Sequence, residues 1–287
     1  MMCTSGYVAS STMPDPEADR LDVALVARGL ARSRAHASEM IRGGRVLVDG
    51  RPASKPAMRI EDARVLDVAA AKGDGDVSRA GGKLRAALDE LSVQPRGLRC
   101  IDVGASTGGF TQVLLERGAA HVVAIDVGTD QLAATLRNDP RVTSLERTHV
   151  GHLEEGQIAP AALVVADLSF ISLRSVIGVL AGLTAPDGLL LPMVKPQFEV
   201  GRSGLDRHGV VTDPGRQRDA VLAVIDAAGE HGLAARAIRR SAVPGPAGNL
   251  EYFVAFTRGA DASGEALWAR DIEAEGGASE PAKRLED

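Results

Sequence analysis

Residues 98–112 read LRCIDVGASTGGFTQ, which is a short apolar strand, a glycine-rich turn and the beginning of a helix. Gly104, Gly108 and Gly109 permit a tight turn and let a ligand come close to backbone N–H groups. The turn is not a P-loop because no Gly-Lys-Ser/Thr follows it, and Ser106 stands where a dinucleotide-binding turn has its second glycine. The stretch therefore predicts a nucleotide-like cofactor cradle at the end of a strand.

The segments around this turn alternate between two patterns. Helical patterns lie near 109–117, 130–137, 172–183 and 214–231. Apolar, strand-like runs lie at 98–104, 121–126, 142–146, 161–169 and 188–196, and two further runs, at 234–243 and 251–258, close the unit. This alternation predicts an α/β fold, a doubly wound, Rossmann-like parallel sheet with helices on both faces. Ligands of such sheets bind at the carboxyl ends of the strands, so the loops that follow the strands form the candidate site.

The segment GASTG at 104–108 also fits the Gly-x-Ser-x-Gly nucleophile elbow, which would make Ser106 the nucleophile of a hydrolase. That elbow usually follows more of a sheet, whereas this turn follows the first strand of its domain, and no HGGG-type loop precedes it. The late histidines His208 and His231 have no evident place in a catalytic triad. A hydrolase is therefore the weaker interpretation of this turn.

Two acidic residues accompany the turn. Asp102 precedes it, and Asp126 ends the next strand, where α/β folds that bind nucleosides hydrogen-bond a ribose diol. With these acids, DVGASTGGF resembles the first motif of class I S-adenosylmethionine-dependent methyltransferases, the alternative being a structural turn whose acids cap helices. The resemblance implies that S-adenosylmethionine is the cofactor. The residues implied to bind it are Asp102, Gly104, Ser106, Thr107, Gly108, Gly109, Phe110 and Asp126.

Residues 19–68 carry a different pattern. Apolar residues with helical spacing lie at 21–30 and 37–41, Ser33 is a candidate N-cap for the second helix, and strands follow at 45–50 and 63–68. Between residues 28 and 59 this unit holds eight bases and two acids. A surface this basic suits a phosphate backbone, although a solvated helix face is the plain alternative.

The run RLDVALVARGLARSRAHASEMIRGGRVLVDGRPASKP resembles the S4-type RNA-binding domain over most of that domain's length. The shared features are the RLD opening, the Ser-Arg pair, the I-x-x-G-x-V-x-V-x-G strand and the later Lys-Pro. The resemblance implies a small α+β domain that binds structured RNA. The residues it implies for RNA binding are Arg20, Arg28, Arg32, Ser33, Arg34, Arg42, Arg45 and Lys55.

Lysine is scarce in this chain, so its placement is informative. Lys195 ends the apolar strand LLLPMV, and Asp167 ends the strand AALVVA. Both are expected at the carboxyl edge of the sheet, where an unpaired buried charge would be costly. An ion pair is the structural interpretation of either residue alone, but an acid and a lysine from separate strands at one ligand-binding edge favour catalysis.

Motifs along the catalytic unit resemble the TlyA family of rRNA cytidine 2′-O-methyltransferases, once called hemolysins. They are SRAGGKL, DVGASTGGFT, AIDVG, RNDPRV, ERTHV, VADLSFISL, MVKPQFEVGR and GNLEYF. The resemblance runs from about residue 19 to 258 and implies an FtsJ-like domain with a catalytic tetrad, Lys83, Asp167, Lys195 and Glu251. Lys195 is the implied base, because a ribose hydroxyl needs a group that takes its proton as it attacks the methyl. Asp167 and Glu251 are expected to orient the lysines, and Lys83 to add positive charge.

The chain departs from the family pattern in two places. Ala80, Gly81 and Gly82 follow the Ser-Arg pair, where the family usually has two glycines and a larger residue. His149 stands where an asparagine is common. His149 and His152 have no acidic partners in the pattern, so no metal site is expected.

The net charge of −5 is not evenly spread. Eight acids and three bases follow residue 260, so the rest of the chain is balanced. We expect a flexible N-terminus at 1–17, an S4-like domain at 18–70, a linker at 71–82, a methyltransferase domain at 83–258 and an acidic disordered tail at 259–287. The two cysteines, far apart, and the lack of a signal peptide or membrane span predict a cytoplasmic protein.

The resemblance to the TlyA family implies an enzyme that methylates the ribose of a cytidine in ribosomal RNA, in 16S or 23S RNA or both. Its expected partners are ribosomal RNA or ribosomal subunits. A non-catalytic RNA-binding or ribosome-assembly factor is the first alternative, and a labelled-methyl assay separates the two. A membrane-active hemolysin is the second, and the lack of a strongly amphipathic segment disfavours it.

Overall fold

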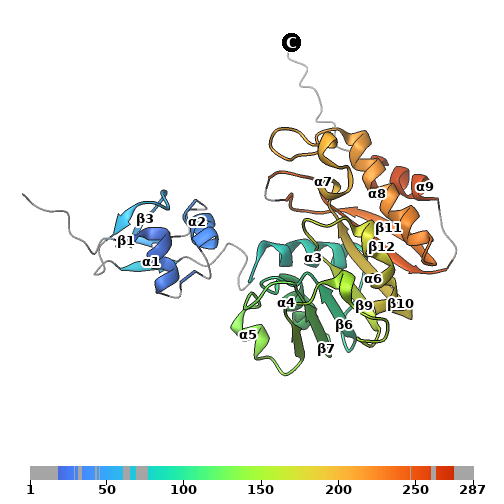
Figure 1. The fold of residues 1–287 in the computed structure, drawn as a ribbon, viewed down its shortest axis with the longest axis horizontal. Coiled ribbons are helices and arrows are strands. Elements are labelled where there is room, and N and C mark those ends of the chain that lie inside the picture. Colours follow the sequence, from blue (N-terminus) through green and yellow to red (C-terminus); the bar gives the residue numbers. More distant parts are fainter. Residues whose placement is uncertain are drawn as a thin grey trace, which may run out of the picture. The chain divides into compact units, whose positions relative to one another are not determined.

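In the computed structural model of the protein the described residues are 19–28, 30–31, 34–42, 44, 46–60, 65–68, 77–245, 247–259 and 263–274. The chain divides into two compact units, Met1–Gly75 and Asp76–Asp287. The first is blue in Figure 1, and the second runs from cyan to red. Within the described ranges, no helix is long and apolar enough to cross a membrane.

The N-terminal unit is a small α+β domain. Its elements are β1 (Asp19–Arg20), α1 (Leu21–Ala27), α2 (Arg34–Arg42), β2 (Val46–Val48), β3 (Arg51–Pro52), β4 (Arg59–Ile60) and β5 (Leu66–Val68). Its core holds Leu21, Leu25, Met40, Ile41 and Val46, so the two predicted helices bury the faces that their spacing indicates. The first helix ends at Ala27, earlier than the apolar spacing predicts. Leu30, which the spacing assigned to this helix, lies beyond its end and is exposed. Ser33 lies outside the described residues, so its predicted cap stays a prediction.

The second unit is built on a seven-stranded sheet with the order β11-β12-β10-β9-β6-β7-β8. The strands are β6 (Arg99–Val103), β7 (His121–Ile125), β8 (Val142–Leu145), β9 (Ala161–Ala166), β10 (Thr184–Val194), β11 (Leu233–Arg240) and β12 (Tyr252–Arg258). The pairs among β10, β9, β6, β7 and β8 are parallel, whereas β12 pairs antiparallel with β10 and β11. The predicted α/β class with its small N-terminal α+β domain is confirmed.

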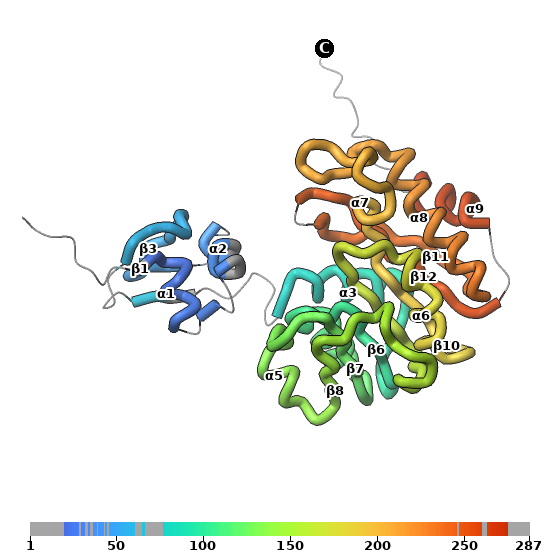
Figure 2. Tube along the Cα trace, viewed as in Figure 1, coloured from blue at the N-terminus to red at the C-terminus, as the bar shows by residue number. Residues whose placement is uncertain are grey.

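Helices cover both faces of this sheet. They are α3 (Arg79–Glu90), α4 (Gly109–Glu116), α5 (Ala134–Arg137), α6 (Ile177–Leu183), α7 (Pro196–Glu199), α8 (Pro214–Gly229) and α9 (Gly264–Trp268). One core cluster joins apolar residues of α3 and α4 to one face, and another joins those of α6, α8 and α9 to the opposite face. Figure 2 shows α8 and α9 side by side on the second of these faces.

Helix α3 was not predicted, and residues 79–82 belong to it rather than to a linker. Adjacent glycines usually destabilise a helix, by about 1 kcal/mol each relative to alanine. Here burial of Leu84 and Leu88 in the core compensates. A Cβ on Gly109 would lie 2.1 Å from Ser78 Oγ and 3.0 Å from Gly81 N. The close approach of α3 and α4 therefore requires small residues where they meet.

The predicted disordered tail is wrong for residues 263–274. They form α9 and a π-helical turn (Ala269–Glu273), and Leu267, Trp268 and Ile272 are buried in the core. The Trp268 ring lies 5.3 Å from that of Tyr252, measured between centroids. Asp271 accepts a hydrogen bond from the Ile238 N–H of the edge strand. Residues 275–287 lie outside the described part of the chain.

Candidate active site

Lys195 and Asp167 meet at the carboxyl edge of the sheet. Asp167 directly follows β9 and Lys195 directly follows β10, and these strands are parallel neighbours. The Lys195 Nζ lies 2.6 Å from Asp167 Oδ1 and donates a hydrogen bond of 2.8 Å to Ser169 Oγ. Lys195 is 9% exposed, so its charge sits in a site that is nearly closed to bulk water.

Lys83 and Glu251 form a second ion pair. The Lys83 Nζ on α3 lies 2.5 Å from Glu251 Oε2, and the side chains are 9% and 1% exposed. Gly245 lies against this carboxylate, since a Cβ there would come within 2.6 Å of Glu251 Oε1. A buried pair of this kind is stable only while both partners remain.

The strand register brings the two ion pairs to one edge. Val194 of β10 lies opposite Tyr252 of β12 in an antiparallel pair. Lys195, which follows Val194, and Glu251, which precedes Tyr252, are therefore neighbours just beyond this pair. Asp167, Lys195 and Glu251 therefore lie at the carboxyl ends of β9 and β10 and the adjoining start of β12, and Lys83 reaches this edge from α3 through its pair with Glu251. Two separate carboxylates each neutralise one lysine.

The glycine turn lies beside this edge. Gly104 and Gly108 have φ values of 83° and 96°, which favour glycine. A Cβ on Gly104 would lie 2.6 Å from the carbonyl oxygen of Asp167, so the turn packs directly against the loop that carries the predicted tetrad. Thr107 is buried, and Phe110 lies in the core with its ring 6.0 Å from that of Phe253. Phe110 thus packs inside the fold.

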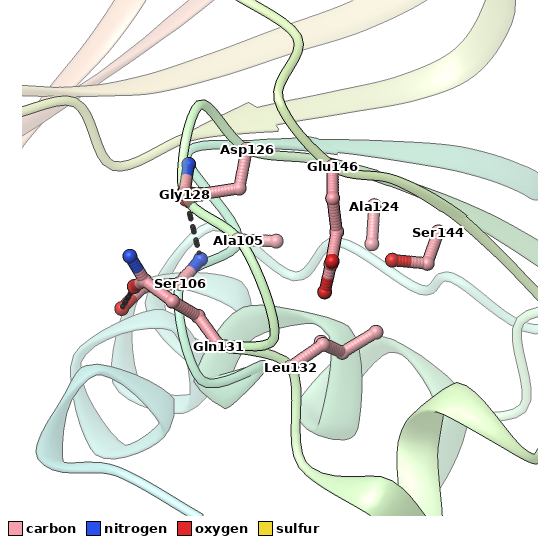
Figure 3. Close-up of a pocket in the computed structure, with 9 residues that line it drawn as sticks. All are labelled: Ala105, Ser106, Ala124, Asp126, Gly128, Gln131, Leu132, Ser144 and Glu146. Atoms are coloured by element: carbon pink, nitrogen blue, oxygen red, sulfur yellow. Dashed lines mark hydrogen bonds between the residues drawn. The ribbon is translucent and has the colours of Figure 1, made fainter. Parts of the chain in front are cut away.

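A pocket adjoins the turn and is drawn in Figure 3. Its lining residues are Ala105, Ser106, Ala124, Asp126, Gly128, Gln131, Leu132, Ser144 and Glu146. Both oxygens of Asp126 accept backbone hydrogen bonds of 2.7 Å, one from Ser106 N–H and one from Gly128 N–H. Asp126 therefore braces the glycine turn and its own loop. The Ser106 hydroxyl contacts the amide oxygen of Gln131, which cannot act as a base, so this contact gives no support to a hydrolase.

Glu146 was not predicted as a site residue. It directly follows β8, and Figure 3 shows its carboxylate pointing into the pocket. Its Oε2 accepts the Asp130 N–H at 2.9 Å, whereas its buried Oε1 has no hydrogen-bond partner among the described residues. An unpaired buried acceptor is costly unless a ligand or water donates to it. The hydroxyl and amino groups of S-adenosylmethionine are donors of the required kind.

Asp102 lies beneath the turn and is completely buried. Its Oδ2 accepts a hydrogen bond of 2.7 Å from Thr111 Oγ, while Oδ1 has no partner among the described residues. Burial, together with the negative charges of Asp167 and Asp126, raises the pKa of Asp102 to about 7. This carboxyl can hold a proton near neutral pH.

Two of the predicted RNA-binding arginines of the N-terminal unit form ion pairs with Asp22, which was not predicted as a site residue. Asp22 is buried, and its oxygens accept hydrogen bonds from Arg20 at 2.9 Å and from Arg34 at 3.4 Å. These guanidinium groups hold the pKa of Asp22 below its usual range. Arg28, Arg42 and Lys55 are exposed, and Arg32, Ser33 and Arg45 lie outside the described residues.

The two histidines considered as metal ligands lie side by side, with ring centroids 4.6 Å apart. The Nδ1 of His149 accepts the Gly151 N–H, which occupies that nitrogen. Across the described ranges, no group of three or more His, Cys, Asp or Glu residues is arranged to hold a metal ion.

This fold and site define a class. Residues 77–258 match the FtsJ-like methyltransferase family, and residues 19–65 match the S4 domain. Two solved structures described as hemolysins are similar. One, from Streptococcus thermophilus, has a TM-score of 0.69 and 31% identity and covers 92% of this chain and 99% of its own. The other, from Lactococcus lactis, has a TM-score of 0.64 and 33% identity and covers 68% and 97%.

Curated relatives narrow the class. The 16S/23S rRNA (cytidine-2′-O)-methyltransferase TlyA of Mycobacterium tuberculosis is 51% identical over 82% of this chain and 88% of its own length. The 23S rRNA (cytidine-2′-O)-methyltransferase TlyA of Campylobacter jejuni is 35% identical over 62% of this chain and 69% of its own. The chain belongs to the TlyA family, as its motifs predicted.

Proposed function

We propose that this protein transfers a methyl group from S-adenosylmethionine to the ribose 2′-oxygen of a cytidine in ribosomal RNA, in the cytoplasm where ribosomes are assembled. The observation that carries the proposal is the Lys195–Asp167 pair, with its contact of 2.6 Å, beside the glycine turn. The named activity of relatives that share this unit supports the choice of substrate.

The cofactor supplies a methyl group on a positively charged sulfur, which is an electrophile ready for in-line attack. The chain's own residues fit such a ligand beside the glycine turn. Asp126 holds the turn in shape through Ser106, and Glu146 offers its unpaired Oε1 to a hydroxyl or amino group. The turn is the predicted cradle, and the pocket of Figure 3 adjoins it.

Lys195 acts as the base in this proposal. In its neutral form, Nζ takes the proton of the 2′-hydroxyl while the oxygen forms a bond to the methyl carbon and the carbon–sulfur bond breaks. Asp167 orients Lys195, and Glu251 holds Lys83 so that its positive charge is fixed near the reacting oxygen. Near-closure of the site strengthens each of these electrostatic interactions.

The N-terminal unit serves RNA binding in this proposal. Its S4 match and the exposed side chains of Arg28, Arg42 and Lys55 support that role. Asp22 holds the side chains of Arg20 and Arg34 at one place on this unit. These side chains therefore lose less conformational entropy when they bind phosphate groups of RNA. Subunits and naked ribosomal RNA are both candidate substrates.

The test is transfer of labelled methyl from S-adenosylmethionine to ribosomal RNA or subunits. Wild-type protein is expected to produce 2′-O-methylcytidine, and Lys195→Ala to lower the rate at least about 100-fold while cofactor binding persists. Lys195→Ala protein with an intact rate would remove Lys195 as the base. Wild-type protein that binds RNA but transfers no methyl would favour the assembly-factor alternative.

A further inference from the structure

Ser169 is a second partner of the candidate base. It lies two residues beyond Asp167, and its Oγ accepts a hydrogen bond of 2.8 Å from Lys195 Nζ. The last paired residues of β9 and β10 are Ala166 and Pro192, and Ser169 and Lys195 both lie in the segments that follow these parallel strands. The lysine nitrogen therefore meets an acceptor on each of two sides, a carboxylate and a hydroxyl.

Two polar contacts leave one direction at the Lys195 nitrogen open. A protonated amine has three N–H bonds, whereas a neutral amine has two N–H bonds and one lone pair. With Ser169 accepting one N–H and the Asp167 carboxylate in contact with the nitrogen at 2.6 Å, the lone pair of neutral Lys195 is left in the remaining direction. A single acceptor would leave rotation about the Cε–Nζ bond undetermined, and a base acts only when its lone pair faces the proton.

The loop that carries Ser169 is held to the segment that carries Lys195. Glu199, four residues after Lys195 on α7, has a side chain that is 1% exposed. Its carboxylate accepts hydrogen bonds from Ser172 Oγ at 2.6 Å and from Leu173 N–H at 2.7 Å. The backbone reverses at Phe170, which has a φ of 65° that bulky residues rarely adopt. These contacts fix Ser169 relative to Lys195.

We propose that Ser169 is a positioning residue that directs the lone pair of Lys195 toward the ribose hydroxyl. The inference rests on the proposed function, in which Lys195 is the base. Ser169 forms no bond to the substrate in this account and acts only through the lysine nitrogen.

The experiment compares Ser169→Ala and Ser169→Thr by single-turnover methyl transfer, KM for RNA and Kd for S-adenosylmethionine. Ser169→Ala is expected to slow transfer about ten-fold, which corresponds to about 1.4 kcal/mol, with KM and Kd unchanged. Ser169→Thr keeps the hydroxyl and is expected to retain most of the rate. Ser175→Ala is the matched control, because Ser175 lies six residues further along the same connection, is exposed and, among the described residues, donates its hydroxyl hydrogen bond to the Ser172 carbonyl.

Two results would overturn the inference: a Ser169→Ala transfer rate equal to that of wild type, or a loss that appears in KM instead. Failure of the proposed function has a different signature, since the wild-type protein would then transfer no methyl, and failure of Lys195 as the base would leave the rate of Lys195→Ala intact. If Lys195→Ala is inactive while Ser169→Ala is unaffected, only the role of Ser169 is rejected.

Discussion

Asp102 couples the stability of the catalytic domain to pH. Its pKa of about 7 in the folded protein lies well above the ordinary value for aspartate, because the carboxyl is completely buried. Below about pH 4 the group is protonated in both folded and unfolded chains, so it makes no difference to stability. As the pH rises from about 4 to 7, the unfolded chain gives up this proton first, which lowers the free energy of unfolding. Above about pH 7 that loss is complete.

We therefore expect Asp102→Asn to gain stability relative to wild type as the pH rises from about 4 to 7, and the gain to stay level above that. Urea unfolding across this pH range measures it. Asp89→Asn is the control. Arg117 holds the pKa of Asp89 below its usual range, so Asp89 is ionised in both folded and unfolded chains across this window, and its replacement should change stability by an amount that does not vary with pH there. A stability difference between Asp102→Asn and wild type that does not change with pH would contradict the assignment.

Replacement of Glu146 tests whether the cofactor occupies the pocket beside the glycine turn. The unpaired Oε1 of Glu146 is expected to accept a hydrogen bond from the cofactor. Glu146→Gln places an amide N–H₂ donor or a neutral oxygen there instead. It should therefore weaken S-adenosylmethionine binding about ten-fold or more. Calorimetric titration measures the Kd directly. Glu116→Gln, an exposed change on α4, is a suitable control. Unchanged affinity in Glu146→Gln would exclude Glu146 from the cofactor site.

At the scale of elements, the segment 263–274 behaves as part of the catalytic domain. Trp268 is 5% exposed and packs against Tyr252, the residue after Glu251. Trp268→Ala should lower the free energy of unfolding by about 3 to 5 kcal/mol, as for other large buried aromatics. Urea unfolding followed by circular dichroism measures this loss, and Trp268→Phe should lose less.

The chain has one tryptophan, so its fluorescence reports on this segment alone. In the wild-type protein the fluorescence transition in urea should coincide with loss of methyl transfer, because Trp268 and Glu251 share one core. A fluorescence change at clearly lower urea would show that the segment detaches independently and would contradict its assignment to the domain.

The elements that sequence analysis predicted correctly are those with a strong local signal. The strands at 98–104, 121–126 and 161–169 are apolar runs that end in acids or turns, and their pattern alone predicts a buried parallel sheet. Helix α3 was missed because Gly81 and Gly82 are poor helix formers. The backbone of Gly81 lies close to Gly109 of α4, whereas a Cβ on Gly82 would meet open space, so nothing in the packing explains Gly82.

The other misses have physical reasons of the same kind. The three large apolar residues of segment 263–274 are diluted by acidic and small residues, so the sequence alone suggests a polar tail. Their role appears only when the sheet face that they cover is known. Glu146 follows a strand as Asp126 and Asp167 do, so its position was a usable signal, although its unpaired oxygen is seen only in the structure. Ser169 has no local signature, since its significance lies in its contact with Lys195. The tetrad was located through family motifs, and the pairing of Lys83 with Glu251 follows only from the fold.

At the scale of the whole molecule, charge is divided between regions. The net charge of −5 suggests a protein that avoids RNA, yet residues 28–59 hold eight bases against two acids. Binding that neutralises phosphates releases counterions, so affinity should fall steeply with salt despite the acidic average.

Arg42→Gln tests this at the exposed end of α2. It should weaken RNA binding and reduce the slope of log affinity against log salt by about 1, with cofactor binding unchanged. Filter binding at several salt concentrations measures the slope. Arg96→Gln is the matched control, because Arg96 is exposed at the amino end of β6, the edge opposite the site. Equal slopes for wild type and Arg42→Gln would remove this residue from the RNA interface.

The most direct test of the central claim is a map of 2′-O-methyl groups on 16S and 23S rRNA that lack them, after incubation with S-adenosylmethionine and the protein. The account predicts that wild-type protein adds 2′-O-methyl to at least one cytidine and that Lys195→Ala protein does not. Maps that are identical with and without wild-type protein would contradict it.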